Sequence, residues 1–240
     1  MNKNNFDFYG LGIAPKIIDT LIGLKFKNAT PIQSKAIPIA LEGKDLIGIA
    51  QTGTGKTMAF GIPLIQQLAK TKSTALILVP TRDLALQVKE SVNQIAQVFK
   101  MKTAVLIGGD PIYRQVRALA QNPQVLIATP GRLIDLMEQR KVRLNTVGIL
   151  VLDEADRMLD MGFAPQIEQI LRCVPKDRQT LLFSATMPVE IVKMSAVYMK
   201  FPVQVEIAPS GTAAEKVSHE LFIIQREMKQ ELLKKVLNQY

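Results

Sequence analysis

The fold is decided by the stretch Ala50-Gln51-Thr52-Gly53-Thr54-Gly55-Lys56-Thr57, which follows an apolar run and leads into Met58-Ala59-Phe60. An apolar strand, a glycine-rich turn and Gly-Lys-Thr at the start of a helix predict a phosphate-binding loop, or P-loop. Glycines let backbone N–H groups converge on an anion, and the N-terminus of the following helix adds positive potential. We expect Lys56 to reach the β- and γ-phosphates of a nucleotide and the Thr57 hydroxyl to hold Mg²⁺. The alternative is a tight turn that only caps a helix.

Short apolar runs alternate with longer segments of helical periodicity along most of the chain. Because the runs are apolar on both faces, they predict an α/β fold, a parallel sheet of about seven strands with helices on both faces. The expected strands cover residues 45–50, 75–79, 103–107, 125–128, 147–152, 180–183 and 203–207. The expected helices between them cover residues 56–69, 82–99, 111–121, 132–139, 163–172 and 189–197. In such sheets ligands bind beyond the carboxyl ends of the strands.

The pattern divides the chain into three segments. Residues 1–44 are expected to be helical, with helices near 14–24 and 31–41, and residues 45–207 form the nucleotide-binding domain. Residues 208–240 begin with a linker and continue with a possible strand at 219–224 and a helix at 227–237. A single strand and helix cannot bury a core of their own. We therefore expect this last segment to be the start of a second domain that is incomplete here.

The formal net charge is +9, and residues 206–240 hold five Lys or Arg against five Asp or Glu, so the excess lies in residues 1–205. A basic surplus indicates a polyanionic partner, nucleic acid first, although solubility alone explains it equally well. No apolar run approaches the length of a membrane span. The one cysteine, Cys173, cannot form an intrachain disulfide, and we expect it to be a small core residue on a helix. These features predict a reducing, cytoplasmic setting.

Carboxylates follow the apolar run 147–152 directly, in the sequence Asp153-Glu154-Ala155-Asp156. Downstream of a P-loop, this placement suits a second phosphate-transfer motif, in which Asp153 holds Mg²⁺ and Glu154 orients or deprotonates the attacking water. The alternative is a cluster that caps the following helix, since Asp and Glu favour helix N-termini. The P-loop upstream favours catalysis, with Lys56, Asp153 and Glu154 as the catalytic residues.

Together these segments resemble the DEAD-box RNA helicases of superfamily 2, over the chain up to about residue 207. Asp153-Glu154-Ala155-Asp156 carries the family's name, and Thr30-Pro31-Ile32-Gln33 resembles its adenine-sensing Q motif. Other segments resemble family motifs in the same order: Pro80 to Ala85, Gly108-Gly109, Thr129-Pro130-Gly131-Arg132 and Ser184-Ala185-Thr186. The resemblance implies a RecA-like domain with ATP and Mg²⁺ as cofactors.

The resemblance also assigns ATP-binding residues. Gln33 would pair with adenine, because its amide offers both a donor and an acceptor, and Phe26 is the aromatic residue of the Q motif. Phe8 lies at the distance upstream at which the family has a second aromatic residue, and it could stack on adenine or anchor the N-terminal helix. Lys25 and Ala29 replace the usual Gly and Pro of the motif, and Ala50 opens the P-loop as it does in the family. The predicted ATP-binding set is Phe8, Phe26, Gln33, Ala50, Gln51, Thr52, Gly53, Thr54, Gly55, Lys56 and Thr57, with Thr57 and Asp153 holding the metal.

RNA contacts and coupling follow from the same resemblance. The predicted RNA-binding residues are Pro80, Thr81, Arg82, Gly109, Thr129, Pro130, Gly131 and Arg132. Such residues bind backbone phosphates, so binding independent of sequence is expected, although ordinary helix capping by the threonines is the alternative. Asp156, Ser184, Ala185 and Thr186 would couple ATP hydrolysis to strand separation, as hydrogen-bond partners across the two motifs.

The sequence thus predicts an ATP-dependent RNA helicase, of which this chain holds the ATP-binding domain and half of the RNA track. The family's His-Arg-x-Gly-Arg segment, which supplies arginine fingers, does not occur in these 240 residues. An arginine finger is worth ~10³–10⁵ in rate in related GTPases, so weak ATPase is expected without a second RecA-like domain in cis. The alternative is an ATP- and RNA-binding module without turnover that acts through a partner. We expect a monomer.

Overall fold

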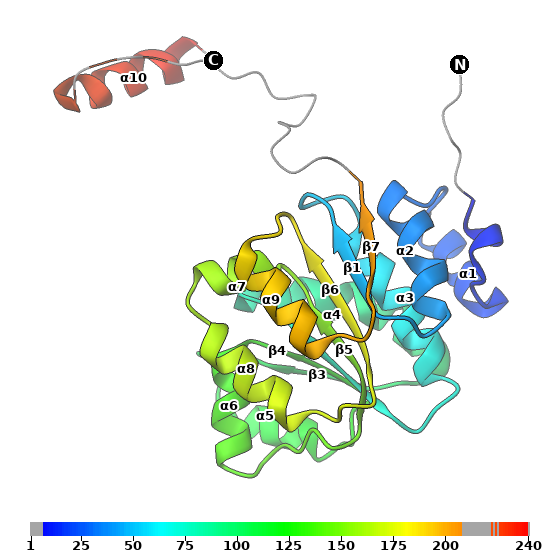
Figure 1. Ribbon diagram of the computed structural model, residues 1–240. Coiled ribbons are helices and arrows are strands. Elements are labelled where there is room, and N and C mark those ends of the chain that lie inside the picture. The colour runs from blue at the N-terminus through cyan, green and yellow to red at the C-terminus, as the bar shows by residue number, and fades with distance from the viewer. Residues whose placement is uncertain (1–6, 208–221, 223, 225, 240) are drawn as a thin grey trace. The chain divides into compact units, whose positions relative to one another are not determined.

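The computed structural model describes residues 7–207, 222, 224 and 226–239. Its centre is a sheet of seven parallel strands in the order β3-β4-β2-β5-β6-β1-β7 (Figure 1). The strands are β1 (Leu46–Ile49), β2 (Thr74–Leu78), β3 (Thr103–Leu106), β4 (Val125–Ala128), β5 (Val147–Leu152), β6 (Gln179–Ser184) and β7 (Val203–Glu206). The predicted α/β fold is confirmed, and each expected strand up to residue 207 is present with ends that differ by at most one residue.

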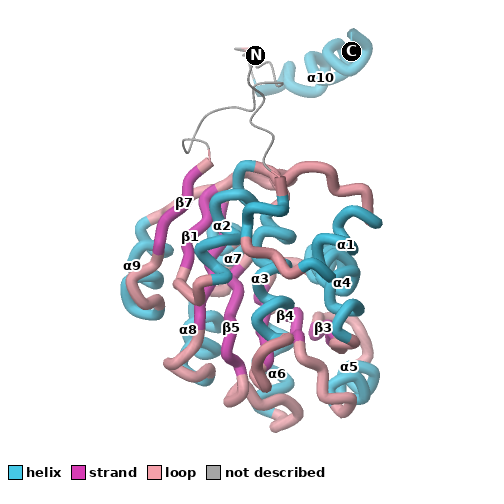
Figure 2. The backbone as a smooth tube through the Cα atoms, turned by 90° about the vertical axis from the view of Figure 1, so that its right-hand side faces the viewer, coloured by secondary structure: helices cyan, strands magenta, loops and turns pink. Residues whose placement is uncertain are grey.

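Helices connect successive strands, as parallel pairing requires (Figure 2). They are α1 (Pro15–Gly23), α2 (Pro31–Leu41), α3 (Lys56–Leu68), α4 (Arg82–Ala96), α5 (Ile112–Leu119), α6 (Pro130–Glu138), α7 (Ala155–Asp160), α8 (Ala164–Cys173), α9 (Val189–Tyr198) and α10 (Lys229–Gln239). Three short 3-10 turns are η1 (Phe8–Leu11), η2 (Gln97–Phe99) and η3 (Arg226–Met228). The expected helices are confirmed, whereas α7 is an element that the sequence patterns did not separate from the Asp153–Asp156 motif.

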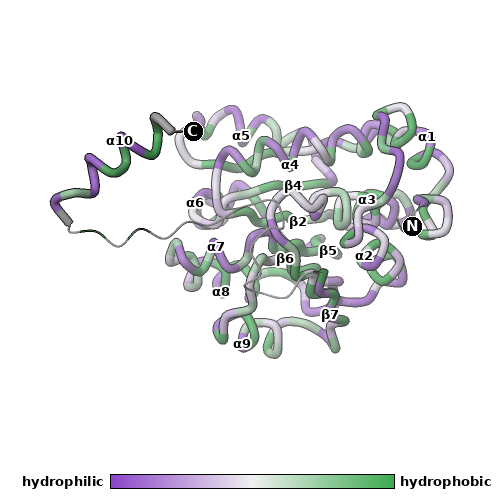
Figure 3. Tube along the Cα trace, turned by 90° about the horizontal axis from the view of Figure 1, so that it is seen from above, coloured by the Kyte–Doolittle hydropathy of each residue, from purple (hydrophilic) through white to green (hydrophobic). Residues whose placement is uncertain are grey.

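Two hydrophobic clusters form the core, one on each face of the sheet. Alternate strand residues point to opposite faces, so Leu46 joins one cluster and Ile47 joins the other. The first cluster receives side chains of α1 to α4, and the second receives those of α5 to α9. The central strands are accordingly hydrophobic along most of their length, while helices alternate in polarity (Figure 3). This double covering is why the strands are continuous apolar runs in the sequence.

The N-terminal helices belong to the same unit as the sheet. The chain divides into two compact units, Met1–Ser210 and Gly211–Tyr240, and α1 and α2 lie in the first. Buried residues of α2, such as Ile32 and Ile37, join the cluster that also holds the buried face of α3. Residues 7–44 therefore pack as part of the same unit as the sheet, which places the Q motif against the P-loop.

The second unit contains η3 and α10 among its described residues. The predicted helix at 227–237 is confirmed with a shifted start, whereas the predicted strand at 219–224 lies largely outside the described residues. Of that strand, Phe222 and Ile224 are described and belong to no strand. The linker at 208–214 and the question of an incomplete second domain also fall outside what is described, so both stay predictions.

One side-chain prediction is wrong. Cys173 is exposed at the end of α8 and is not a core residue. The buried stripe of this helix consists of Ile167, Ile170 and Leu171, and Cys173 lies on a different side of the helix. In the part of the chain that is described, none of the helices has the length and apolarity needed to cross a membrane.

Candidate nucleotide and RNA site

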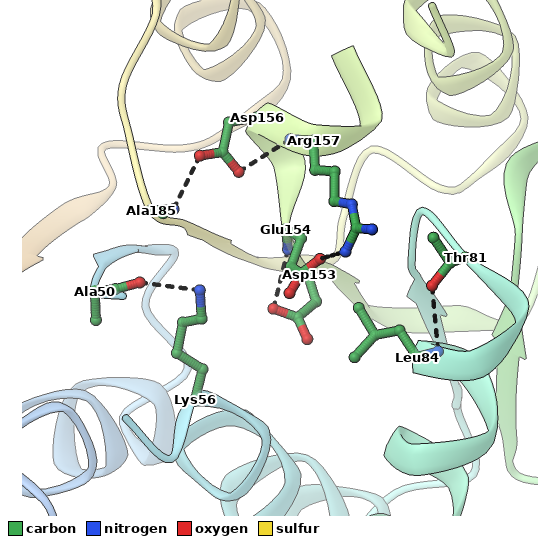
Figure 4. A network of polar contacts seen from close by, with 9 residues as sticks. All are labelled: Ala50, Lys56, Thr81, Leu84, Asp153, Glu154, Asp156, Arg157 and Ala185. Atoms are coloured by element: carbon green, nitrogen blue, oxygen red, sulfur yellow. Dashed lines mark hydrogen bonds and ion pairs between the residues drawn. The ribbon is translucent and has the colours of Figure 1, made fainter. Parts of the chain in front are cut away.

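The P-loop runs from the end of β1 to the start of α3. Gly53 and Gly55 both have positive φ, +82° and +93°, which a side chain would strain. The Lys56 side chain is buried, and its Nζ donates a hydrogen bond to the Ala50 carbonyl at 2.9 Å (Figure 4). An ammonium has three donors, so two N–H groups of Lys56 remain for a phosphate. The structure therefore has the backbone and the lysine that phosphate binding requires.

The remaining P-loop residues face outward to different degrees. Gln51, Thr52 and Gly53 are exposed, Thr54 and Thr57 are half-buried, and Ala50 is buried at the end of β1. The Thr54 hydroxyl donates to the Gln51 carbonyl at 2.7 Å, which closes the turn. The predicted ATP-binding residues of this loop thus form one continuous turn, open to solvent at its tip.

Gln33 ties the N-terminal helices to the P-loop. Its Oε1 accepts a hydrogen bond from the Thr30 N–H at 3.0 Å, and its Nε2 donates to the Gly55 carbonyl at 3.0 Å. The residue is only 3% exposed, so Gln33 is not a solvated polar residue on the surface of α2. One N–H and one lone pair of the amide remain, which is the set that adenine pairing would use. The second contact explains why position 55 must be glycine, because a Cβ there would lie 2.5 Å from Gln33 Nε2.

The two aromatic residues are placed differently. Phe8 is 4% exposed and is part of the first core cluster, so the structure shows the anchoring role that was one of its two alternatives. Stacking on adenine would need one face of this ring to become accessible, and it stays a prediction. Phe26 is half-buried and packs against the same cluster.

Asp153 and Glu154 lie where β5 ends. Asp153 is 3% exposed, and burial raises its pKa to about 6 although the nearby Lys56 charge opposes the shift. Glu154 has a left-handed backbone with φ +51°, and its N–H donates to Asp153 Oδ1 at 3.0 Å. Its carboxylate pairs with Arg157 at 3.1 Å and makes no capping bond to α7, whereas Asp156, in the first turn of α7, accepts a hydrogen bond from the Arg157 N–H at 3.0 Å, so the capping alternative holds for Asp156 but not for Glu154. Figure 4 shows Lys56, at the start of α3, in the same region as Asp153, which directly follows β5.

Asp156 links the end of β5 to the segment after β6. Its Oδ2 accepts hydrogen bonds from the Ala185 and Thr186 N–H groups at 3.2 and 2.9 Å and from the Thr186 hydroxyl at 2.9 Å. Its own N–H donates to the Ser184 hydroxyl at 3.2 Å. Burial would raise the pKa of Asp156, but the hydrogen bonds from Thr186 and Ser184 outweigh it, so the pKa lies below its usual value. The predicted hydrogen bonding between these two motifs is confirmed.

Three of the predicted RNA-binding segments meet at the loop after β3. Gly109 has φ +78°, a conformation that strains any residue with a side chain, and a Cβ there would also displace the guanidinium of Arg82. Arg82 Nη2 lies 4.0 Å from the Asp110 carboxylate, and Arg132 Nη1 donates to the Asp110 carbonyl at 3.0 Å. Arg132 also lies 3.7 Å from Asp135 and is only 11% exposed as a side chain. Arg82 is accessible, whereas Arg132 braces this loop.

Thr81 and Thr129 are each the N-cap of a helix, which is the alternative to RNA binding. Thr81 is the N-cap of α4, and its hydroxyl accepts from the Leu84 N–H at 3.3 Å. Thr129 is the N-cap of α6 without a side-chain capping bond, and it is followed by Pro130 at the first helical position. Gly131 leaves open space where a Cβ would be, and Pro80 is buried. Capping by Thr81 does not prevent its hydroxyl from also donating to a phosphate.

Two residues of this site were not predicted. Arg157 pairs with Glu154, and Asp110 contacts both arginines of the RNA-binding segments. The pairing of Arg157 with Glu154 could have been predicted from the sequence, because the two residues are three positions apart at the start of a helix. The contacts of Asp110 could not, since Asp110 and Arg132 come together only when the loops after β3 and β4 meet.

The donor set fits a magnesium nucleotide. Asp153 is a buried carboxylate that ionises with difficulty, so a divalent cation would stabilise its charged form. Among the described residues, no group of three or more His, Cys, Asp or Glu is arranged so that it could hold a metal ion. Mg²⁺ is normally held by one or two protein oxygens together with phosphates and waters, and Thr57 and Asp153 supply such a pair. These features, on a parallel sheet with a glycine-rich turn after β1, define a P-loop nucleotide-binding protein with a RecA-like fold.

The chain belongs to the DEAD/DEAH box helicase family, whose model matches residues 30–194. ATP-dependent RNA helicase CshA from Listeria monocytogenes is 43% identical over 233 residues, which are 96% of this chain and 45% of that protein. ATP-dependent rRNA helicase RRP3 from Candida albicans is 40% identical over 236 residues, 97% of this chain and 44% of that protein. The chain thus spans about half the length of the curated relatives that it matches.

Solved structures agree with this assignment. A DEAD box protein from the hyperthermophile Methanococcus jannaschii superposes with a TM-score of 0.81 at 34% identity, over 96% of this chain and 63% of that one. The yeast DEAD-box splicing factor Prp28 superposes with a TM-score of 0.80 at 32% identity, over 95% of this chain and 57% of that one. The RecA-like fold predicted from the sequence is therefore confirmed.

Proposed function

We propose that this chain is the ATP-binding domain of an ATP-dependent RNA helicase that couples ATP hydrolysis to local opening of an RNA duplex. The observation that supports this most directly is the meeting of Lys56, from the P-loop, with buried Asp153 and adjacent Glu154 at the end of β5. Gln33, bound to the P-loop through Gly55, adds a group that selects the base. Family membership and the names of the relatives agree with this activity.

Each residue has a proposed role in hydrolysis of ATP by water to ADP and phosphate. Lys56 and the N–H groups of the P-loop bind the β- and γ-phosphates, and Gln33 pairs with adenine. Thr57 and Asp153 would hold Mg²⁺, which would neutralise phosphate charge. Glu154 orients the attacking water and takes its proton. Arg157 holds the Glu154 carboxylate at 3.1 Å and so positions it.

RNA is the proposed activator, bound through its backbone without regard to sequence. Thr81, Arg82, Gly109 and the start of α6 at Thr129 lie after β2, β3 and β4, which are neighbours in the sheet. Backbone N–H groups, hydroxyls and an accessible arginine are the donors that phosphates and 2′-hydroxyls accept from. Asp156, bonded to the segment 184–186, would transmit changes at Glu154 to the end of β6.

Full activity is proposed to need a second RecA-like domain in cis, because this chain spans about half of its relatives and holds half of the RNA track. The isolated chain should bind ATP, hydrolyse it weakly and fail to unwind RNA. Robust RNA-stimulated unwinding by the 240 residues alone would contradict this. A cytoplasmic setting, a monomeric state and the absence of a membrane partner belong to the same proposal, and any protein cofactors are unassigned.

The test is the kinetics of Glu154→Gln in a protein that carries both RecA-like domains. We expect RNA-stimulated ATPase to fall by about 10²-fold or more, since general base catalysis contributes about that much, while ATP binding is kept. The matched control is Glu90→Gln, which changes an exposed carboxylate on α4 in the same way. ATPase of Glu154→Gln at the wild-type rate would overturn the catalytic assignment.

The alternative is an ATP- and RNA-binding module without turnover. The intact set of Lys56, Asp153 and Glu154 favours hydrolysis. The same experiment separates the two functions, because a module would show no ATPase in the wild-type protein and would still bind both ligands. Comparing RNA with DNA as activators tests the nucleic acid, and equal activation by DNA would contradict an RNA helicase.

A further inference from the structure

The end of the sheet at which the strands begin lies opposite to the nucleotide site and carries an unusual concentration of positive charge. Four loops enter the neighbouring strands β2, β3, β4 and β5, and they cover residues 69–73, 100–102, 120–124 and 139–146. They contain seven Lys or Arg and no Asp or Glu. We call these four loops the basic edge. Its cations are Lys70, Lys72, Lys100, Lys102, Arg140, Lys141 and Arg143, and all seven are exposed.

The remaining loops at this end of the sheet carry nearly balanced charges. The loops that enter β1, β6 and β7 hold four Lys or Arg and three Asp or Glu within residues 42–45, 174–178 and 199–202. Charges there pair locally, as in Lys44–Glu42 at 2.7 Å and Lys200–Asp177 at 3.0 Å. In contrast, none of the seven cations of the basic edge forms an ion pair with any residue that the structure describes. The excess positive charge is therefore local and uncompensated.

Backbone pairing holds the four loops of the basic edge together. Thr74 N–H donates to the Thr146 carbonyl at 2.9 Å, and Ala75 N–H donates to the Gln124 carbonyl at 2.8 Å. Gln124 N–H donates in turn to the Lys102 carbonyl at 3.0 Å. Because the strands are parallel, their starts lie at one end of the sheet, and Figure 2 shows loops gathered at the ends of the strands. The cations thus form one surface rather than scattered charges.

A recess of about 460 Å³ lies within this surface. Lys72, Lys141 and Arg143 line it, together with Thr71 and Ser73. No carboxylate and no aromatic side chain is among its lining residues. Such a site offers cations and hydrogen-bond donors to phosphate oxygens, whereas it offers no ring on which a splayed base could stack.

Compensation of helix dipoles explains only part of this charge. Lys100 and Arg140 have φ +55° directly after helical segments, where cations stabilise the helix C-terminus. That effect is confined to the last turn of a helix. Lys72, Lys141 and Arg143 lie beyond the last turns of α3 and α6, so their convergence on one recess needs another reason.

We propose that the basic edge is a second, sequence-independent binding site for the phosphate backbone of an RNA duplex, with Lys72, Lys141 and Arg143 as its centre. It is separate from the predicted RNA-binding residues, which follow β2, β3 and β4 at the other end of the strands. A site without stacking rings holds a base-paired segment through its phosphates and leaves the pairing intact. It would keep a duplex near the protein while the RNA-binding residues at the opposite end of the strands act on that duplex. The identity of the polyanion as RNA rests on the proposed function.

The test is binding of a fluorescently labelled blunt RNA duplex, without nucleotide, at several KCl concentrations. The site variant is Lys72→Gln/Lys141→Gln/Arg143→Gln. The control variant is Lys16→Gln/Lys89→Gln/Lys193→Gln, which removes three exposed cations from α1, α4 and α9 and changes the net charge equally. A charge-preserving variant, Lys72→Arg/Lys141→Arg/Arg143→Lys, checks that charge rather than packing is responsible.

We expect the site variant to weaken binding at least about tenfold more than the control at low salt. The slope of log Kd against log salt should fall by about three, one for each phosphate contact that is lost. The charge-preserving variant should keep the wild-type slope. Equal effects of the site and control variants on Kd and slope would overturn the inference and leave the proposed function standing.

Two other outcomes also count against the inference. If the site variant loses binding of inorganic pyrophosphate but binds the duplex as wild type does, the recess is a site for a small anion. If the wild-type chain binds no RNA at any salt concentration, both this inference and the proposed RNA-binding function fail.

Discussion

Replacing Asp153 by Asn should stabilise the folded protein at neutral pH. Burial raises the pKa of Asp153 from 3.8 to about 6, so between these values the folded protein holds a proton that the unfolded chain has released. The free energy of unfolding therefore falls as pH rises through this window. A shift of about two pKa units corresponds to about 3 kcal/mol. Asn is neutral and nearly isosteric, and its side-chain oxygen can still accept the hydrogen bond from the Glu154 N–H.

The measurement is urea unfolding of wild type and Asp153→Asn at pH values from 4 to 8, with a metal chelator and without nucleotide. We expect similar stability near pH 4, and at pH 7 an advantage for Asp153→Asn of up to about 3 kcal/mol at unchanged m-value. The control is Asp156→Asn, which should behave oppositely. The pKa of Asp156 is lowered by its hydrogen bonds, so its ionised form stabilises the fold at neutral pH and loses this effect as pH falls.

Parallel unfolding profiles of the two proteins from pH 4 to 8, or a lower stability of Asp153→Asn at pH 7, would contradict a destabilising charge on Asp153. Either result would mean that the Lys56 charge fully compensates the burial of Asp153. The same substitution should abolish Mg²⁺-dependent ATP binding. A gain in stability together with a loss of binding is the pattern expected for a residue retained for function.

Three further substitutions test other features. Gly55→Ala should weaken ATP binding more than Gly53→Ala, because both glycines have positive φ but only position 55 lacks room for a Cβ, as titration with ATP would show. Cys173→Ser should change the free energy of unfolding by less than about 0.5 kcal/mol, since the residue is exposed; a loss of several kcal/mol in urea unfolding would restore the core assignment. Thr186→Val removes one hydrogen bond to Asp156 and should cost about 1 kcal/mol in thermal unfolding, with RNA-stimulated ATPase lowered as well.

The strands and most helices could be predicted because burial on both faces of a parallel sheet leaves a direct trace in the sequence. Strands 125–128 and 147–152 agree with β4 and β5 to the residue. One strand begins earlier than its apolar run predicts. β6 begins at Gln179, a polar residue that apolar patterning leaves out. Gln179 is nevertheless buried, since its amide donates to the Ala40 and Lys44 carbonyls.

The site was predictable where chemistry is concentrated in consecutive residues, and not where it depends on meetings between loops. The P-loop and Asp153-Glu154 are continuous motifs that follow strands, so the rule for parallel sheets places them correctly. The contacts of Asp110 with Arg82 and Arg132 join three loops, and neither periodicity nor spacing contains them. The predicted burial of Cys173 was wrong for a related reason, since the sequence pattern does not determine which side of α8 its last residue faces.

Backbone conformation gives an independent argument for the role of Glu154. Six described residues other than glycine have positive φ, and four of them follow the end of a helical segment, where a left-handed residue is a common ending. These four are Lys25, Lys100, Asn122 and Arg140, while Phe201 lies in the loop before β7. Glu154 differs, because it precedes a helix and its φ of +51° costs a non-glycine residue roughly 1–2 kcal/mol. Glycine would relieve that cost but carries no carboxylate, so the strain at Glu154 is consistent with a side chain kept for its chemistry.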